Sequence, residues 1–165
     1  MASRTDDERW MRRAIELARR GEMHNGTNPI GCVLVRDGAV LAEGCNEVDV
    51  RHDPTAHAEI VAIRSAGATL QCHELRGATL YSTLQPCGMC TMASIWAKVG
   101  RIVFGAGRED VHPMYFEERH LDTMDFIRDA FRNDLALEGG VMSEACAELY
   151  IRPWTKVPRE QQFNR

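Results

Sequence analysis

The sequence predicts an α/β fold, specifically a three-layer α/β/α sandwich with a central mixed sheet of about five strands. Three observations support this prediction. An amphipathic helix opens the chain, short apolar segments alternate with helical ones, and one strand, helix and strand are joined by turns so short that the two strands must be parallel. We expect the 165 residues to form one domain, residues 1–165, with a polar tail from about residue 153 to 165.

The first half of the chain predicts a helix, a β-hairpin and a second helix. Apolar residues recur at helical spacing behind the acidic pair Asp6 and Asp7, which predicts an amphipathic helix that Gly21 and Gly26-Thr27-Asn28-Pro29 then break. Residues 30–35 and 39–43 are expected to form antiparallel strands around a tight turn. Residues 44–55 are polar and are expected to be irregular, and a helix follows over residues 56–66.

The second half of the chain predicts the parallel part of the sheet. Strands are expected over residues 78–84 and 101–105, with a helix over residues 87–98 between them. Residues 107–121 have no clear period, and a loop of that length predicts a functional segment, here part of a pocket wall. A helix over residues 122–132, a short strand over residues 135–138 and a last helix over residues 143–152 complete the prediction.

Composition and charge narrow the class of protein. The formal net charge is −4, and no large basic cluster is visible, so the balance favours a small-molecule substrate over a polynucleotide. Arg12-Arg13 and Arg19-Arg20 are the first place to look for a local basic groove, although they also fit the solvated face of a helix. The polar start and the lack of a long apolar run predict a cytoplasmic protein with no membrane span, in which the scattered thiols of Cys32, Cys45, Cys72 and Cys146 are reduced.

The strongest chemical signal comes in two parts, His57-Ala58-Glu59 and Pro86-Cys87-Gly88-Met89-Cys90. His57, Cys87 and Cys90 are donors that Zn²⁺ prefers, and three protein ligands leave the fourth tetrahedral position free for water. We therefore predict one catalytic Zn²⁺ per chain. Glu59 follows the first ligand too closely to join it easily and is predicted to be the general acid and base.

Each part of this signal is ambiguous by itself. A lone Cys-x-x-Cys pair also occurs as a redox pair or as half of a structural zinc site, and a lone His at a helix start also occurs as a cap. Together they favour catalysis, because each part falls at the start of a predicted helix, where the helix dipole lowers a thiol pKa. The alternative of another class is a non-catalytic structural zinc module, which requires a fourth ligand such as Cys45 or His52.

With these motifs the chain resembles the cytidine/deoxycytidylate deaminase superfamily of zinc-dependent nucleobase and nucleoside deaminases, in the branch with bacterial guanine deaminases, fungal-type cytosine deaminases and tRNA adenosine deaminases. The resemblance runs from the first helix to Gly105. It implies zinc held by His57, Cys87 and Cys90, a proton shuttle at Glu59, and a homodimer. The segments that carry it are Asn28-Pro29-Ile30-Gly31, Asp53-Pro54-Thr55-Ala56-His57-Ala58-Glu59 and Pro86-Cys87-Gly88-Met89-Cys90.

The resemblance also suggests substrate-binding positions. Asn46 falls where these deaminases keep an Asn that hydrogen-bonds the base, although it also fits a turn after Gly44-Cys45. Trp96 falls where similar guanine deaminases carry Trp, and it fits a purine contact or an ordinary core position equally well. Phe116-Glu117-Glu118 matches an aromatic and acidic cluster of guanine deaminases, or a solvated turn.

The predicted reaction is zinc-dependent hydrolytic deamination of a free nucleobase or nucleoside. Guanine leads, giving xanthine and ammonia, because of Trp96 and the acidic loop. The alternatives are a tRNA-specific adenosine deaminase, with tRNA as the partner, and a deaminase of cytosine, isocytosine, guanosine or an aminotriazine. Two departures from the family pattern are Gln85, where Glu is usual, and the segment His112-Pro113-Met114-Tyr115, which differs from the small-residue loop of tRNA adenosine deaminases.

Overall fold

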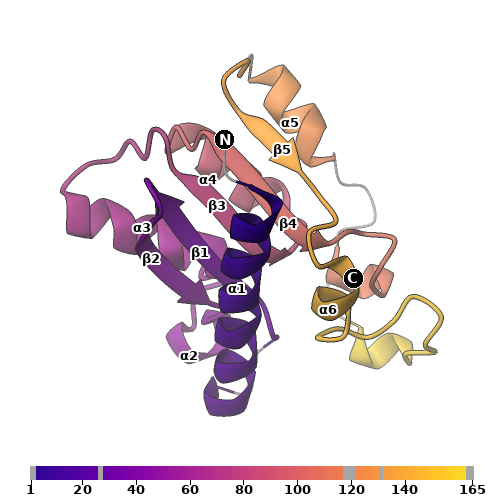
Figure 1. The fold of residues 1–165 in the computed structure, drawn as a ribbon. Helices are drawn as coiled ribbons and strands as arrows, with labels where there is room; N and C mark the ends of the chain where they lie inside the picture. Colours follow the sequence, from indigo (N-terminus) through magenta and orange to yellow (C-terminus); the bar gives the residue numbers. More distant parts are fainter. Residues whose placement is uncertain (1–2, 26–27, 117–121, 131, 163–165) are drawn as a thin grey trace.

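A mixed sheet of five strands forms the centre of the computed structural model, which describes residues 3–25, 28–116, 122–130 and 132–162 (Figure 1). Its strand order is β2-β1-β3-β4-β5. The strands β2, β1 and β3 pair antiparallel, whereas β3, β4 and β5 pair parallel, which confirms the predicted mixed sheet and its crossover. The strands are β1 (Gly31–Arg36), β2 (Ala39–Cys45), β3 (Thr79–Leu84), β4 (Arg101–Ala106) and β5 (Ala136–Glu138).

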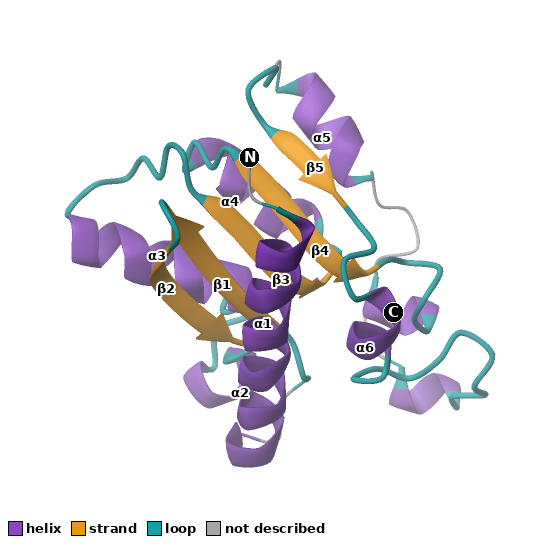
Figure 2. Cartoon of the chain, viewed as in Figure 1, coloured by secondary structure: helices purple, strands orange, loops and turns teal. Residues whose placement is uncertain are grey.

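Helices cover both faces of the sheet, as Figure 2 shows. On β4, Arg101 reaches α1 (Arg4–Asn25), and Gly105 lies against Cys146 of α6 (Ser143–Ala147). Residues four apart on a strand share a face, so α1 and α6 lie on the same side. The other side carries α3 (Ala58–Leu70) and α4 (Gly88–Trp96), with α5 (Thr123–Asp129) packed beside α4. The predicted three-layer α/β/α arrangement is therefore confirmed.

Two local predictions are wrong. Residues 44–55 are not wholly irregular, because α2 (Val48–Arg51) forms there, supported by the Val48 N–H that donates to the Asn46 side-chain oxygen at 3.1 Å. The last helix is shorter than predicted and ends at Ala147. Beyond it the chain leaves helical geometry, because the Ile151 carbonyl accepts the His112 N–H at 2.7 Å.

Short 3₁₀ turns interrupt the predicted loop and the tail after β4. In the predicted loop of residues 107–121, a 3₁₀ turn, η1 (Pro113–Tyr115), is present, and residues 117–121 lie outside the described residues. In the tail, residues Arg159–Gln161 form a second 3₁₀ turn, η2. All six cysteines fall within the described ranges and are free thiols. In the described part of the chain no helix combines the length and the apolar character that a membrane span requires.

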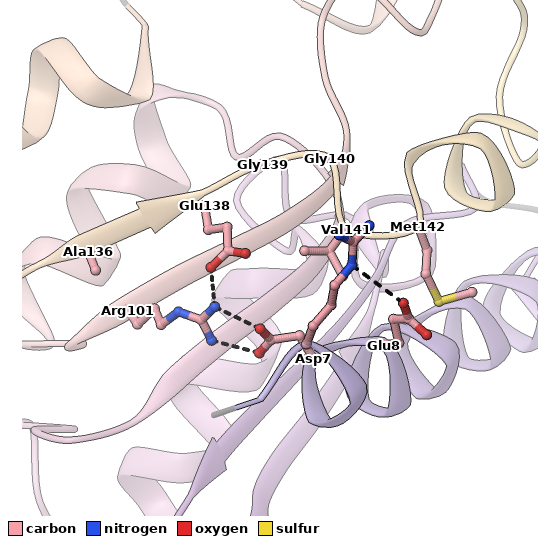
Figure 3. Close-up of a pocket in the computed structure, with 10 residues that line it drawn as sticks. Asp7, Glu8, Arg101, Ala136, Glu138, Gly139, Gly140, Val141 and Met142 are labelled. Atoms are coloured by element: carbon pink, nitrogen blue, oxygen red, sulfur yellow. Dashed lines mark hydrogen bonds and ion pairs between the residues drawn. The ribbon is translucent and has the colours of Figure 1, made fainter. Parts of the chain in front are cut away.

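An ion-pair network joins the first helix to the parallel edge of the sheet (Figure 3). Arg101 of β4 donates to both carboxylate oxygens of Asp7 on α1, at 2.7 and 2.8 Å, and it also pairs with Glu138 of β5. The Tyr81 hydroxyl donates to Asp7 at 2.7 Å. The Asp7 side chain is only 3% exposed, so almost no water can solvate its charge. These hydrogen bonds take the place of that water and stabilise the buried carboxylate.

Candidate active site

Three potential metal ligands converge where two helices begin. His57 is the N-cap of α3, Cys87 is the N-cap of α4, and Cys90 lies in the first turn of α4. The His57 Nδ1 atom lies 3.7 Å from the Cys87 sulfur and 3.6 Å from the Cys90 sulfur. Tetrahedral bonds of about 2.0 to 2.3 Å place zinc ligands roughly 3.5 Å apart, so the spacing and the donor set both fit Zn²⁺.

No fourth protein ligand completes this group within the described residues. The ligand atoms that lie within 4.8 Å of one another belong to His57, Cys87 and Cys90, and neither Cys45 nor His52 joins them. A structural zinc site normally has four protein ligands, whereas a catalytic one keeps a position open. The described residues therefore favour a catalytic centre over a structural one.

Close packing of α3 against the sheet positions the histidine. A Cβ atom on Gly44 of β2 would lie 2.3 Å from the Ala58 carbonyl oxygen, so only glycine allows the first turn of α3 to sit this close to the strand. Ala58 directly follows His57. The cysteines are positioned separately, because β3 ends at Leu84 and leads through Pro86 into α4.

The two thiols differ in their affinity for a proton. The hydrogen bond with Cys90, followed by the one with His57, lowers the pKa of Cys87 to about 4 despite its burial. The same bond and burial raise the pKa of Cys90. The lowered pKa favours the thiolate form of Cys87, which is the form that binds metal. Of the two thiols predicted to have a lowered pKa, only Cys87 has one, and its leading cause is the neighbouring thiol and not the helix start.

Glu59 lies beside the metal ligands and does not join them. Its side chain is 4% exposed, and the Ser82 hydroxyl of β3 donates to its Oε1 atom at 3.1 Å. Burial and the negative charge of Cys87 raise its pKa, which His57 and the hydrogen bond from Ser82 partly oppose. A raised pKa makes the buried carboxyl group hold a proton more readily than an exposed one, which suits a general acid and base.

A cavity of about 460 Å³ opens onto this group. His57 and Cys87 line one part of it, and Asn46 and Tyr115 line others. Asn46 is 5% exposed, and its side-chain oxygen accepts the Val48 N–H at 3.1 Å, which fixes the orientation of its amide group. The structure therefore brings Asn46 to the site and places the predicted loop, through Tyr115, in the pocket wall.

Trp96 is not brought to this cavity. It lies six residues beyond Cys90, which moves it about 9 Å along the helix, and its side chain is 74% exposed. The alternative of a core position is wrong as well. Phe116 is buried at 5% exposure, and Glu117 and Glu118 lie outside the described residues.

Sequence reasoning did not assign Asn28 and Tyr115 to the site, although both line the cavity. Asn28 stood in one of the segments that carry the family resemblance, so that signal could have found it. Tyr115 stood in the loop predicted to wall the pocket, but nothing in the local pattern distinguished it from its neighbours.

Comparison with known proteins decides the family. The sequence model of the cytidine and deoxycytidylate deaminase zinc-binding region matches residues 4–106. The chain belongs to this family. The deaminase is accordingly an aminohydrolase with a zinc cofactor, in agreement with the His, Cys and Cys group described above.

Curated relatives of the deaminase include enzymes for two substrates. The tRNA-specific adenosine deaminase of Haemophilus influenzae is 37% identical over 160 residues, which cover 96% of this chain and 89% of the relative. The guanine deaminase of Bacillus subtilis is 39% identical over 111 residues, which cover 67% of this chain and 71% of the relative.

Solved structures similar to the deaminase include members of both groups. A structure from a study of A-to-I editing by tRNA:A34 deaminases is 33% identical, with a TM-score of 0.72 and coverage of 86% of this chain and 98% of that one. A structure of the guanine deaminase from Nitrosomonas europaea is 25% identical, with a TM-score of 0.76 and coverage of 86% and 81%.

Proposed function

We propose that this deaminase converts adenosine to inosine in a tRNA, releasing ammonia. The observation that carries the proposal is the extent of its similarity to tRNA-specific adenosine deaminases. The Haemophilus influenzae enzyme aligns over 96% of this chain, including the part beyond residue 106, whereas the Bacillus subtilis guanine deaminase aligns over 67%.

The proposed roles follow from the site geometry. His57, Cys87 and Cys90 would hold Zn²⁺, which when bound activates water for attack on the carbon that bears the amino group. Glu59 takes one proton of that water on its carboxylate and passes it to the adjacent ring nitrogen. It then takes the second proton, from the hydroxyl now bound to the carbon, and delivers it to the departing amine, which leaves as ammonia. Ser82 holds the Glu59 carboxylate in place, and the Asn46 amide hydrogen-bonds the bound nucleoside.

The two features that favoured guanine in the sequence analysis, Trp96 and the acidic loop, gain no support from the structure. Trp96 does not line the cavity, and the two acidic residues of the loop are not described. The cavity also borders a second one, of about 520 Å³, with which it shares Asn28 and Tyr115. A free base needs no such extension, whereas a polynucleotide has neighbouring nucleotides to accommodate. The extension therefore supports the RNA substrate.

Two arginines of α1 suit an RNA backbone despite the negative net charge. Arg19 and Arg20 are exposed near the end of α1. Burial and Glu47 raise the pKa of the Cys45 thiol while Arg20 opposes that rise, so Arg20 lies close to the strand end that leads to Asn46. Arg12, in contrast, pairs with Glu8 at 3.1 Å nearer the start of the helix.

The test compares the zinc-loaded protein on an RNA hairpin with a tRNA anticodon loop and on free guanine. We expect inosine from the hairpin, at a rate that falls steeply between about 50 and 200 mM salt, and no ammonia from guanine. The double variant Arg19→Ala with Arg20→Ala should weaken RNA binding and its salt dependence, whereas Arg12→Ala should not. Xanthine from guanine with no inosine from RNA would establish a guanine deaminase instead.

We further propose that a second copy of the chain covers the outer side of α4, giving a homodimer. Trp96 is 74% exposed, and Met89, seven residues earlier and hence on the same side of the helix, is 36% exposed and lines the cavity, so a second copy on this side would also border the site. Exposed large apolar side chains grouped in this way are typical of interfaces. Light scattering should give twice the chain mass for the wild type and a monomer for Trp96→Glu; a monomeric wild type at micromolar concentration would exclude the dimer.

A further inference from the structure

The segment that follows the zinc-binding region holds the start of the cysteine-bearing helix. Thr123, at 2% exposure, donates its hydroxyl to the Pro86 carbonyl at 3.1 Å. Pro86 directly precedes Cys87. The ring of Phe126 lies against Gly88 so closely that a Cβ atom there would be 2.8 Å from its Cζ atom. The first residues of α5 thus fix the backbone on both sides of Cys87.

The same segment holds the other end of α4. Arg132 donates to the Ile95 carbonyl at 2.8 Å and to the Val99 carbonyl at 2.9 Å, and its side chain is only 9% exposed. Carbonyl groups at the end of a helix lack partners within the helix, and a cation there also interacts favourably with the helix dipole. Arg132 therefore stabilises the last turn of the helix that begins with Cys87 and Cys90.

A third contact explains a departure from the family pattern. Gln85, at 7% exposure, donates its amide to the Asp122 carboxylate at 3.4 Å. Asp122 is also the N-cap of α5, where it accepts the Met124 N–H at 2.9 Å. The glutamate usual at position 85 would set two carboxylates against each other here, so the neutral amide is what allows α5 to dock on the loop before Cys87.

We propose that α5 and Arg132 form a clamp that positions the two cysteine thiols for zinc. All of these clamp residues lie beyond residue 106, where the family match ends. Ligands that their surroundings hold in place bind metal more tightly than mobile ligands, because binding then costs less conformational entropy. Loss of a supporting contact typically weakens metal affinity about 10- to 100-fold. The proposal depends on the zinc site and not on the identity of the substrate.

The experiment measures zinc affinity of the purified full-length chain by competition with a chromophoric chelator. Thr123→Val removes the hydroxyl at constant shape, and its control is Thr69→Val at an exposed position of α3. Arg132→Met removes the cation, and its control is Arg128→Met, whose side chain is 73% exposed. We expect the two clamp variants to bind zinc about 10- to 100-fold more weakly and the two controls to match the wild type.

A second readout separates positioning from general stability. Thermal unfolding of the metal-free protein is measured for every variant, and Thr123→Ser, which restores the hydroxyl, should restore zinc affinity. Variants that unfold earlier but bind zinc like the wild type would overturn the proposal. If Thr123→Val does not fold, Gln85→Glu decides in the same assay, because unchanged zinc affinity there would also overturn it. None of these outcomes depends on whether RNA or guanine is the substrate.

Discussion

The Ser82 hydroxyl of the central strand β3 donates to Oε1 of Glu59 on α3 at 3.1 Å. Both side chains are buried, at 0% and 4% exposure, so water cannot replace this bond. The bond holds the proposed proton shuttle in one orientation beside His57, and the residue that donates it belongs to a strand inside the central sheet.

Ser82→Ala should therefore slow turnover without abolishing it. Loss of one buried hydrogen bond, about 1.4 kcal/mol, corresponds to roughly a tenfold fall in kcat when the bond acts in the transition state. KM should change little, because Ser82 does not line the cavity. Steady-state kinetics on the RNA hairpin measure both constants, with the exposed Ser65→Ala as the control. An unchanged kcat would show that Glu59 does not need this support.

Glu59→Ala should keep the metal and lose the chemistry. The carboxylate does not belong to the group of ligand atoms, so zinc content measured by elemental analysis should stay at the wild-type value. Turnover should fall by about two to four orders of magnitude, as expected for loss of a general acid and base. Loss of zinc from this variant would contradict the role of shuttle and indicate a ligand, and retained activity would refute the assignment.

Asp7→Asn should destabilise the protein in a pH-dependent way. Burial raises the pKa of Asp7, but hydrogen bonds from Arg101 and Tyr81 outweigh it, and the net pKa is lowered from 3.8. The ionised carboxylate therefore stabilises the fold above that ordinary value, and its contribution is lost as the pH falls through the lower folded-state value. The mutation removes the charge of the buried partner and leaves Arg101 paired with Glu138 alone, which should cost about 1 to 3 kcal/mol at neutral pH.

Urea unfolding of the wild type and Asp7→Asn from neutral to acidic pH measures this effect. The difference in free energy of unfolding should be largest above pH 5 or so and should shrink below about pH 4. The exposed Asp129→Asn is the control. A difference that does not depend on pH would mean that packing, and not the charge of Asp7, joins α1 to β4.

Gly44→Ala should disturb the histidine side of the metal site. Its Cβ atom would lie 2.3 Å from the Ala58 carbonyl oxygen and 2.9 Å from the Ala62 nitrogen, both backbone atoms. Helix α3 must then move away from β2, at a cost of about 1 to 3 kcal/mol. Thermal unfolding and zinc affinity should both decline. Gly100→Ala, whose new contacts would be 3.6 Å or longer, should leave zinc affinity intact; equal losses in the two variants would argue against this explanation.

The periodicity of the sequence determined most of the elements. Apolar runs near glycines predicted β1, β3 and β4. The short turns predicted that β3 and β4 pair in parallel, as they do in the structure. Periodicity predicted neither α2 nor the early end of α6. The first depends on the Asn46 side chain and the second on a bond between His112 and Ile151, which are contacts that periodicity does not encode.

The sequence alone also predicted the zinc ligands, because metal preference depends on residue type. His57, Cys87 and Cys90 are zinc donors wherever they stand, and their place at helix starts followed from local patterns. Only the tertiary structure decided that Tyr115 lines the cavity whereas Trp96 is exposed and does not line it, and that Thr123 holds Pro86 from 37 residues further along the chain. The physical reason is that local sequence fixes what each residue can do, whereas the packing of distant segments fixes which residues meet.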